Sequence, residues 1–149
     1  MIGIVDYGMG NLHSVRSALQ RLGEQSVISS SAKELEKADA LILPGVGAYP
    51  DAMARLKKQG LDLLLKHHAE AGMPVLGICL GMQLLFEGSE EHGDTAGLGF
   101  LRGYARLFPG ITSAGNVYKV PHIGWNALTF RQPNHPLLKQ VERGHVYFV

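Results

Sequence analysis

The sequence has little of what marks secreted, membrane or nucleic-acid-binding proteins. Its one cysteine, Cys79, excludes an internal disulfide or a cysteine zinc cluster and fits a reducing compartment. No basic N-terminal segment precedes a long apolar stretch, and no apolar run approaches the length of a membrane span. The formal net charge of +1 gives no electrostatic reason to bind nucleic acid or an anionic membrane. We therefore expect a cytoplasmic protein with neither of those partners.

What the 149 residues do contain is an alternation of short apolar runs with helical patterns. The runs predict strands over 2–6, 25–29, 39–45 and 74–79, and the helical patterns predict helices over 12–22, 31–38, 51–72 with an interruption near Gly60, and 80–88. Strands that alternate with helices predict an α/β fold with a doubly wound, mainly parallel sheet and helices on both faces.

The alternation ends after Gly88. A polar, glycine-rich loop is expected over 89–99, and the remaining elements are predicted as strands over 103–108, 116–120, 125–130 and 145–149, with a short helix over 135–141. Turns between these strands favour a small antiparallel part after residue 100. The length suits one domain, so residues 1–149 are interpreted as a single domain.

The segment Gly77-Ile78-Cys79-Leu80-Gly81 fits the pattern of a nucleophile in a sharp turn between a strand and a helix. Glycine on both sides lets the chain turn without clashing side chains. A helix N-terminus favours the thiolate, and the Leu80 amide is free to donate to an oxyanion. The alternative is a small buried core cysteine, which is common. A core cysteine does not require two flanking glycines, so the pattern favours the nucleophile.

A second candidate element, Pro44-Gly45-Val46-Gly47, lies at the end of the preceding predicted strand. Parallel strands end at the same edge of a sheet, so the amides of residues 45–47 are expected to face Cys79 and complete an oxyanion hole. The alternative is an ordinary strand-to-helix turn, for which proline and glycine suffice.

Three other polar residues with side chains that could serve a site lie on predicted helices. Gln83 follows Cys79 by one helical turn and can lean toward the same pocket, although an exposed helix residue is the commoner case. His67 and His68 are adjacent on a helix and point in different directions, so they cannot bind one metal and are interpreted as surface residues. We expect neither a metal nor a cofactor.

Four segments, GICLGMQLLFEGS, LPGVGAYPDAM, VDYGMGNLHSV and KVPHIGWN, together resemble the class I (triad) glutamine amidotransferases. More narrowly, the chain is similar over essentially its whole length to the glutaminase subunits of imidazole glycerol phosphate synthase, from histidine biosynthesis. The cysteine turn is shared across the larger family, whereas DYGMGNL, PGVG and PHIGWN are specific to this subunit. Glutaminase subunits of other synthases, such as anthranilate synthase, are not expected to carry PHIGWN.

The resemblance implies that Cys79 attacks the side-chain amide of glutamine, that ammonia leaves from a glutamyl thioester, and that water then releases glutamate. It assigns an oxyanion hole to the main-chain amides of Gly45, Val46, Gly47 and Leu80, and glutamine binding to Gly47 and Gln83.

The resemblance also implies a heterodimer with a (βα)8-barrel cyclase subunit. That partner would receive the ammonia and convert a phosphorylated ribonucleotide intermediate to imidazole glycerol phosphate and an aminoimidazole carboxamide ribotide. The residues expected to face the partner are Asn11, Pro121, His122 and Trp125.

One part of the family pattern has no match in this sequence. The F-H-P-E type motif supplies the general base and its orienting acid in the family, and the family's His-Ser-Tyr is missing after Tyr147-Phe148-Val149. The histidines weighed as substitutes and interpreted as surface or turn residues are His13, His92, His122, His135 and His145. We expect a domain that lacks its C-terminal portion, hydrolyses glutamine negligibly alone, and self-associates through an apolar edge near 145–149.

Two alternatives to this function remain open from the sequence. One is a non-catalytic α/β module that binds a partner and keeps Cys79 inert in its core. The other is a different cysteine enzyme, either the glutaminase subunit of another synthase or a hydrolase with an unrelated substrate.

Overall fold

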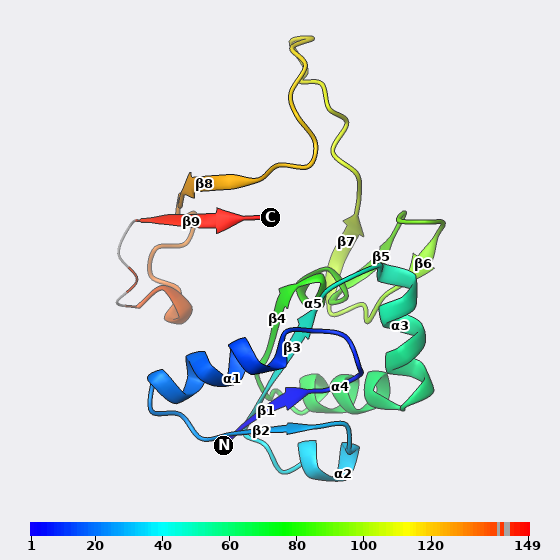
Figure 1. The fold of residues 1–149 in the computed structure, drawn as a ribbon, viewed down its shortest axis with the longest axis vertical. Coiled ribbons are helices and arrows are strands. Elements are labelled where there is room, and N and C mark those ends of the chain that lie inside the picture. The colour runs from blue at the N-terminus through cyan, green and yellow to red at the C-terminus, as the bar shows by residue number, and fades with distance from the viewer. Residues whose placement is uncertain (140, 142–143) are drawn as a thin grey trace. The chain divides into compact units, whose positions relative to one another are not determined.

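The computed structural model describes residues 1–139, 141 and 144–149 (Figure 1). The chain divides into two compact units, Met1–Leu107 and Phe108–Val149, and each is described by itself. Cys79 and the turn over 44–47 belong to the first unit, so the candidate site is built within it.

A four-stranded parallel sheet forms the centre of the first unit (Figure 1). Its strands are β1 (Ile2–Val5), β2 (Ser26–Ser29), β3 (Ala40–Gly45) and β4 (Val75–Cys79), in the spatial order β2-β1-β3-β4. The helices are α1 (Leu12–Arg21), α2 (Ala32–Leu35), α3 (Tyr49–Lys58), α4 (Leu61–Glu70) and α5 (Leu80–Gln83). All three strand pairs are parallel, because each connection returns through a helix to the starting end of the sheet. The predicted mainly parallel α/β fold is confirmed.

Apolar side chains cover both faces of this sheet. Val5 and Leu43 belong to the larger buried cluster, which includes residues of α3 and α4. Ile4 and Ile42, their neighbours in the chain, belong to a smaller cluster with Leu19 of α1. Because successive strand residues point to opposite faces, the two clusters lie on opposite sides of the sheet. The continuous apolar runs in the sequence therefore reflect strands buried on both faces, as expected.

Local signals set the helix ends where the sequence predicts them. Asn11 caps α1, since its Oδ1 accepts a hydrogen bond from the Ser14 amide at 3.2 Å. Gly60 has φ +68° and separates α3 from α4, which confirms the predicted interruption of the helix over 51–72. The longest helices have ten residues, and no helix of the described residues is long and apolar enough to span a membrane.

The helix predicted over 80–88 is wrong beyond its first turn. A three-stranded sheet follows α5, with β5 (Phe86–Ser89), β6 (Thr95–Ala96) and β7 (Leu101–Ala105) in the order β6-β5-β7. β5 runs antiparallel to β6 and parallel to β7. The Leu85 carbonyl, which continues the helical spacing in the sequence, accepts hydrogen bonds from the Phe100 and Leu101 amides instead. Pairing with residues distant in the sequence overrides the local helical pattern here.

The second unit contains a strand pair and a short 3-10 helix. β8 (Gly124–Ala127) runs antiparallel to β9 (His145–Phe148), and η1 (Pro136–Leu138) lies between them in the chain. The expected small antiparallel part after residue 100 is confirmed. The strand expected over 116–120 is wrong, since only an isolated bridge joins Val117 to Ile111. Part of the helix expected over 135–141 lies outside the described residues.

Candidate active site

Cys79 ends β4 and precedes α5 in a main-chain conformation that is rare for a residue with a side chain. Its φ is 56° and its ψ is −120°. Non-glycine residues at positive φ are strained and cluster at functional sites, where the surrounding structure holds them in place. Cys79 is exposed, whereas the next residue, Leu80, is buried. The alternative of a buried core cysteine therefore does not hold.

Three glycines around Cys79 are required by close packing. A Cβ on Gly81 would lie 1.8 Å from the Leu43 carbonyl oxygen, and one on Gly77 would lie 2.5 Å from the Met82 Cα. A Cβ on Gly45 would lie 2.6 Å from the Gly81 amide nitrogen. Contacts this short to main-chain atoms leave no space for a side chain. The flanking glycines thus let the start of α5 sit directly against the end of β3, while the strained torsion angle belongs to Cys79 itself.

The turn over 44–47 lies beside Cys79, as its position in the sheet predicts. Gly45 is the register partner of Cys79 in the parallel pair of β3 and β4. Val46 is half exposed, and Gly47 follows with φ +88°. Because α5 has only four residues, its dipole contributes little positive potential, so amide donors near the thiol matter more than the helix.

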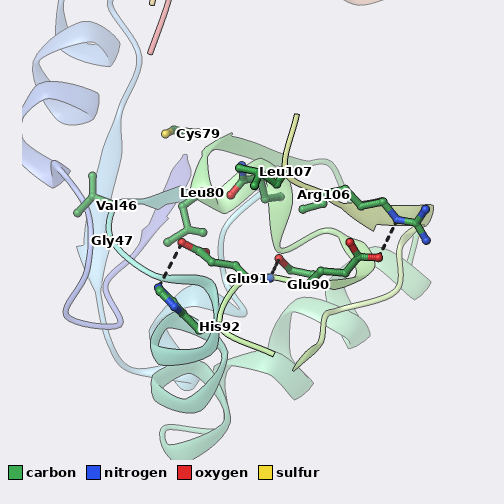
Figure 2. Close-up of a pocket in the computed structure, with 12 residues that line it drawn as sticks. Val46, Gly47, Cys79, Leu80, Glu90, Glu91, His92, Arg106 and Leu107 are labelled. Atoms are coloured by element: carbon green, nitrogen blue, oxygen red, sulfur yellow. Dashed lines mark hydrogen bonds and ion pairs between the residues drawn. The ribbon is translucent and has the colours of Figure 1, made fainter. Parts of the chain in front are cut away.

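A cavity of about 550 Å³ opens next to the thiol (Figure 2). It brings Cys79 together with three other predicted site residues, Val46, Gly47 and Leu80, and with Gln83, which is exposed at the end of α5. Gly45, the remaining predicted site residue, is buried at the β3 end and does not line it. His92, interpreted from the sequence as a surface or turn residue, also lines the cavity. The lining residues that sequence reasoning missed are Ser89, Glu90, Glu91, Ala105, Arg106 and Leu107.

The missed residues make one part of the wall charged with both signs. The Arg106 Nε lies 3.0 Å from the Glu90 Oε1 (Figure 2). The Glu91 Oε2 accepts a hydrogen bond at 2.8 Å from the amide of Tyr49, the first residue of α3. The His92 Nε2 lies 4.0 Å from the Glu91 Oε1, and His92 itself has φ 54°. A wall with carboxylates and a guanidinium suits a small zwitterion. No cluster of three metal-ligating side chains occurs in the described residues.

Two fully buried tyrosines lie in the core next to the site. Burial, and secondarily the charge of Cys79, raise the pKa of the Tyr7 hydroxyl to about 12. Burial also raises the pKa of Tyr49. Both phenols are therefore neutral near pH 7.

The residues expected to face a partner fall in different units. Asn11 belongs to the first unit, where its side-chain oxygen caps α1. Pro121, His122 and Trp125 belong to the second unit, and all three are exposed. The Trp125 ring makes an edge contact with the Tyr147 ring across the β8–β9 pair, at 5.4 Å between centroids.

The interpretation of His68 as a surface residue is wrong. Its side chain is only 5 % exposed, and its Nε2 has no hydrogen-bond partner among the described residues. Burial, and secondarily the neighbouring His67, lower the pKa of His68. His67 is exposed, as expected. The period of α4 explains the difference, since residues 64, 65 and 68 share its inward face.

Comparison with known families identifies one domain over most of the chain. Residues 3–118 match the CobB/CobQ-like glutamine amidotransferase domain. A crystal structure described as a glutamine amidotransferase shares the fold, with a TM-score of 0.74 over 99% of this chain and 70% of that one, at 19% sequence identity.

Curated relatives are similar over the whole chain. Imidazole glycerol phosphate synthase subunit HisH of Halalkalibacterium halodurans and that of Geobacillus kaustophilus are each 60% identical to it, and that of Bacillus subtilis is 52% identical. In each case the match covers 100% of this chain and 70% of the relative.

Proposed function

The chain belongs to the HisH subunits of imidazole glycerol phosphate synthase, within the glutamine amidotransferases, and from this premise we propose that it cleaves the side-chain amide of glutamine. One observation carries the proposal within the structure. The exposed, strained Cys79 faces a cavity of about 550 Å³ together with the turn that follows β3. This is the arrangement that acyl transfer to a thiol requires.

The proposed reaction proceeds in two halves. The Cys79 sulfur attacks the amide carbon of glutamine, and the carbonyl oxygen becomes an oxyanion that accepts hydrogen bonds from amides of residues 45–47 and of Leu80. The carbon–nitrogen bond then breaks, the nitrogen leaves as ammonia with an added proton, and a thioester remains. Water attacks the thioester, so that glutamate leaves and the thiol is restored. The sum is glutamine and water giving glutamate and ammonia.

The wall of the cavity supports an amino acid as the substrate. Glutamine carries an ammonium and a carboxylate on its α-carbon, and Glu90, Glu91 and Arg106 provide charges of the opposite signs. Gly47 and Gln83 line the same cavity, so they are proposed to contact the substrate. An uncharged ester substrate would make no use of this wall.

The general base has no assigned residue in this proposal. His92 lines the cavity, but its contact with Glu91 is long, at 4.0 Å, and its side chain is largely exposed. The F-H-P-E type motif that the family uses is not matched in the sequence. A positioned acid–base group contributes about 10²–10⁴-fold in rate, so we expect steady hydrolysis by these 149 residues to be negligible. Steady glutamate release by mass-verified protein would contradict this expectation.

Covalent labelling of Cys79 is therefore the sharper test. The L-chloroketone analogue of glutamine should alkylate Cys79 at least tenfold faster than its D-enantiomer, with loss of chloride and a mass increase confined to the peptide that contains residue 79. Cys79→Ser should abolish the adduct. Equal rates for the two enantiomers would favour a general thiol hydrolase, and no adduct at all would favour a non-catalytic module.

The proposed partner is a cyclase subunit. The relatives are named as one subunit of a synthase, and that name implies a second subunit. We propose that it receives the ammonia and forms imidazole glycerol phosphate and an aminoimidazole carboxamide ribotide, and that Asn11, Pro121, His122 and Trp125 face it. The 68 % exposure of the Trp125 side chain supports this, since exposed aromatic residues commonly anchor interfaces. Trp125→Ala should weaken binding to a purified cyclase subunit by about tenfold or more in calorimetry.

Two broader assignments accompany this function. The family match over residues 3–118 supports one glutamine amidotransferase domain, although the chain divides into two compact units. The single cysteine supports a cytoplasmic location, which cell fractionation with an antibody would test.

A further inference from the structure

Tyr7 is a fully buried residue whose hydroxyl reaches the edge of the candidate site. It follows β1 by two positions and belongs to the larger core cluster. Its hydroxyl donates a hydrogen bond to the Pro44 carbonyl oxygen at 2.9 Å. Tyr7 does not line the cavity, so it does not touch the substrate proposed to bind there.

The hydrogen bond from Tyr7 satisfies a main-chain acceptor that the sheet leaves free. The register of β1 against β3 ends at the pair Ile4 and Ile42, two residues before Pro44. A buried carbonyl without a partner costs about 1–3 kcal/mol. The phenol thus takes the place of a main-chain amide on the β1 side of β3, where the pairing with β1 has ended while Pro44 stays paired with Ile78 of β4.

This bond fixes the orientation of the Pro44–Gly45 peptide unit, the first unit of the turn whose amides are predicted to form the oxyanion hole. A peptide bond is planar, so the Pro44 carbonyl and the Gly45 amide turn together. Gly45 is the register partner of Cys79. A Cβ on Gly45 would lie 2.8 Å from the Tyr7 hydroxyl, which shows how closely the phenol is set against this unit.

The main chain of Tyr7 is also held in place. The Gln59 side chain, at the end of α3, donates a hydrogen bond to the Tyr7 carbonyl at 3.2 Å, and the Gly8 amide donates to the Asp6 Oδ1 at 3.0 Å. The phenol therefore extends from a main chain that is held in place. The raised pKa of Tyr7 keeps the hydroxyl protonated, so that it can donate a hydrogen bond. A rigid donor is what precise placement of a second group requires.

We propose that the Tyr7 hydroxyl is a positioning residue for amide cleavage. By holding the Pro44 carbonyl, it sets the direction of the amides of residues 45–47 relative to the Cys79 sulfur. The inference rests on the proposed glutaminase function and deepens it. It assigns a role to a side chain outside the cavity that sequence reasoning did not single out.

The test compares two reagents on the same thiol. The L-chloroketone analogue of glutamine places a carbonyl oxygen where the oxyanion forms, whereas iodoacetamide alkylates by direct displacement of iodide and needs no oxyanion hole. Tyr7→Phe removes one oxygen atom and should slow the chloroketone reaction about tenfold while changing the iodoacetamide rate less than about twofold. Both rates are measured at a temperature where circular dichroism shows the variant to be folded.

Tyr49→Phe is the matched control. Tyr49 is equally buried in the same cluster, but its hydroxyl has no hydrogen-bond partner among the described residues. It should leave the ratio of the two rates unchanged. An unchanged ratio in Tyr7→Phe, or an equal slowing of both reagents, would overturn the positioning role. Loss of enantiomer preference in the unmodified protein would instead overturn the glutaminase function, so the two failures are distinguishable.

Discussion

The two units of this chain differ in how they bury apolar surface. The buried apolar side chains all lie between Ile4 and Leu98, on both faces of the central sheet or beside it. None of the described residues from 108 to 149 is buried. The second unit is instead held by one antiparallel strand pair, and an isolated pair of strands is marginally stable in water. The buried core of the first unit supplies the stability that the strained bend at Cys79 requires, whereas the described part of the second unit has no buried side chain to supply it.

Amide hydrogen exchange should show the largest difference between the units. Amides of β1 and β3 are expected to exchange on the order of a thousandfold more slowly than those of β8 and β9, because only the former require opening of a buried core. Exchange is followed by mass spectrometry on peptides from each unit. Comparable protection in the two strand pairs would contradict the difference in core burial between the two units.

Gly81→Ala should be the most damaging single change in the first unit. Its Cβ would lie 1.8 Å from the Leu43 carbonyl oxygen, so β3 and α5 must separate, which we expect to lower the free energy of unfolding by more than about 3 kcal/mol. Gly23→Ala is the control. At φ +78° with no atom within 4 Å, it should cost only about 1 kcal/mol. Urea unfolding measures both, and equal losses would contradict the packing argument.

A pair of leucine truncations compares the units directly. Leu65→Ala empties a fully buried position and should cost about 3 kcal/mol. Leu137→Ala removes a side chain that is 74 % exposed and should cost less than about 0.5 kcal/mol. Both are read from thermal unfolding. A loss of similar size at residue 137 would mean that the second unit has a core of its own.

Most of the central sheet could be predicted from the sequence. Its strands are continuous apolar runs, its helices begin at a capping residue such as Asn11, and they are interrupted at glycines such as Gly60. These signals are local, so they can be read without knowledge of the fold. Residues 84–88 carry a local helical pattern as well, and the prediction failed there because the pairing of β5 with β7 outweighs it.

The candidate site also has one part that could be predicted from the sequence and one part that could not. Cys79 and the turn over 44–47 follow from glycine patterns at strand ends, and Gln83 follows from its position one helical turn after Cys79. The charged wall was missed because the pairing of Ser89 with Ala105 is what brings Glu90 beside Arg106. The adjacent acidic residues Glu90 and Glu91, which follow Gly88 in the polar segment, are the signal that would have found the first half of this wall.

A smaller pair of substitutions compares the helix caps of the two units. Asn11→Ala removes the acceptor for the Ser14 amide and should cost about 1 kcal/mol of unfolding free energy, which Asn11→Asp should restore. His135→Ala removes the Nδ1 acceptor for the Leu137 amide at η1. Since that turn packs no buried side chain, the same measurement should detect no loss. A loss at residue 135 equal to that at residue 11 would contradict the difference between the units.

The smallest predicted effect is a pH dependence that belongs to the first unit alone. Burial lowers the pKa of His68, so the unfolded chain binds a proton at that residue more readily than the folded chain. Stability is therefore lost as the pH falls below about 6.5, the ordinary histidine pKa, and this contribution is fully present above it. His68→Gln should flatten the dependence of the unfolding temperature between pH 8 and pH 5.5, although Glu36 and His67 line the same small hollow. His67→Gln removes only the secondary cause of the lowered pKa of His68, so it should leave most of the dependence in place. An unchanged slope in His68→Gln would mean that this imidazole is hydrated in the folded protein.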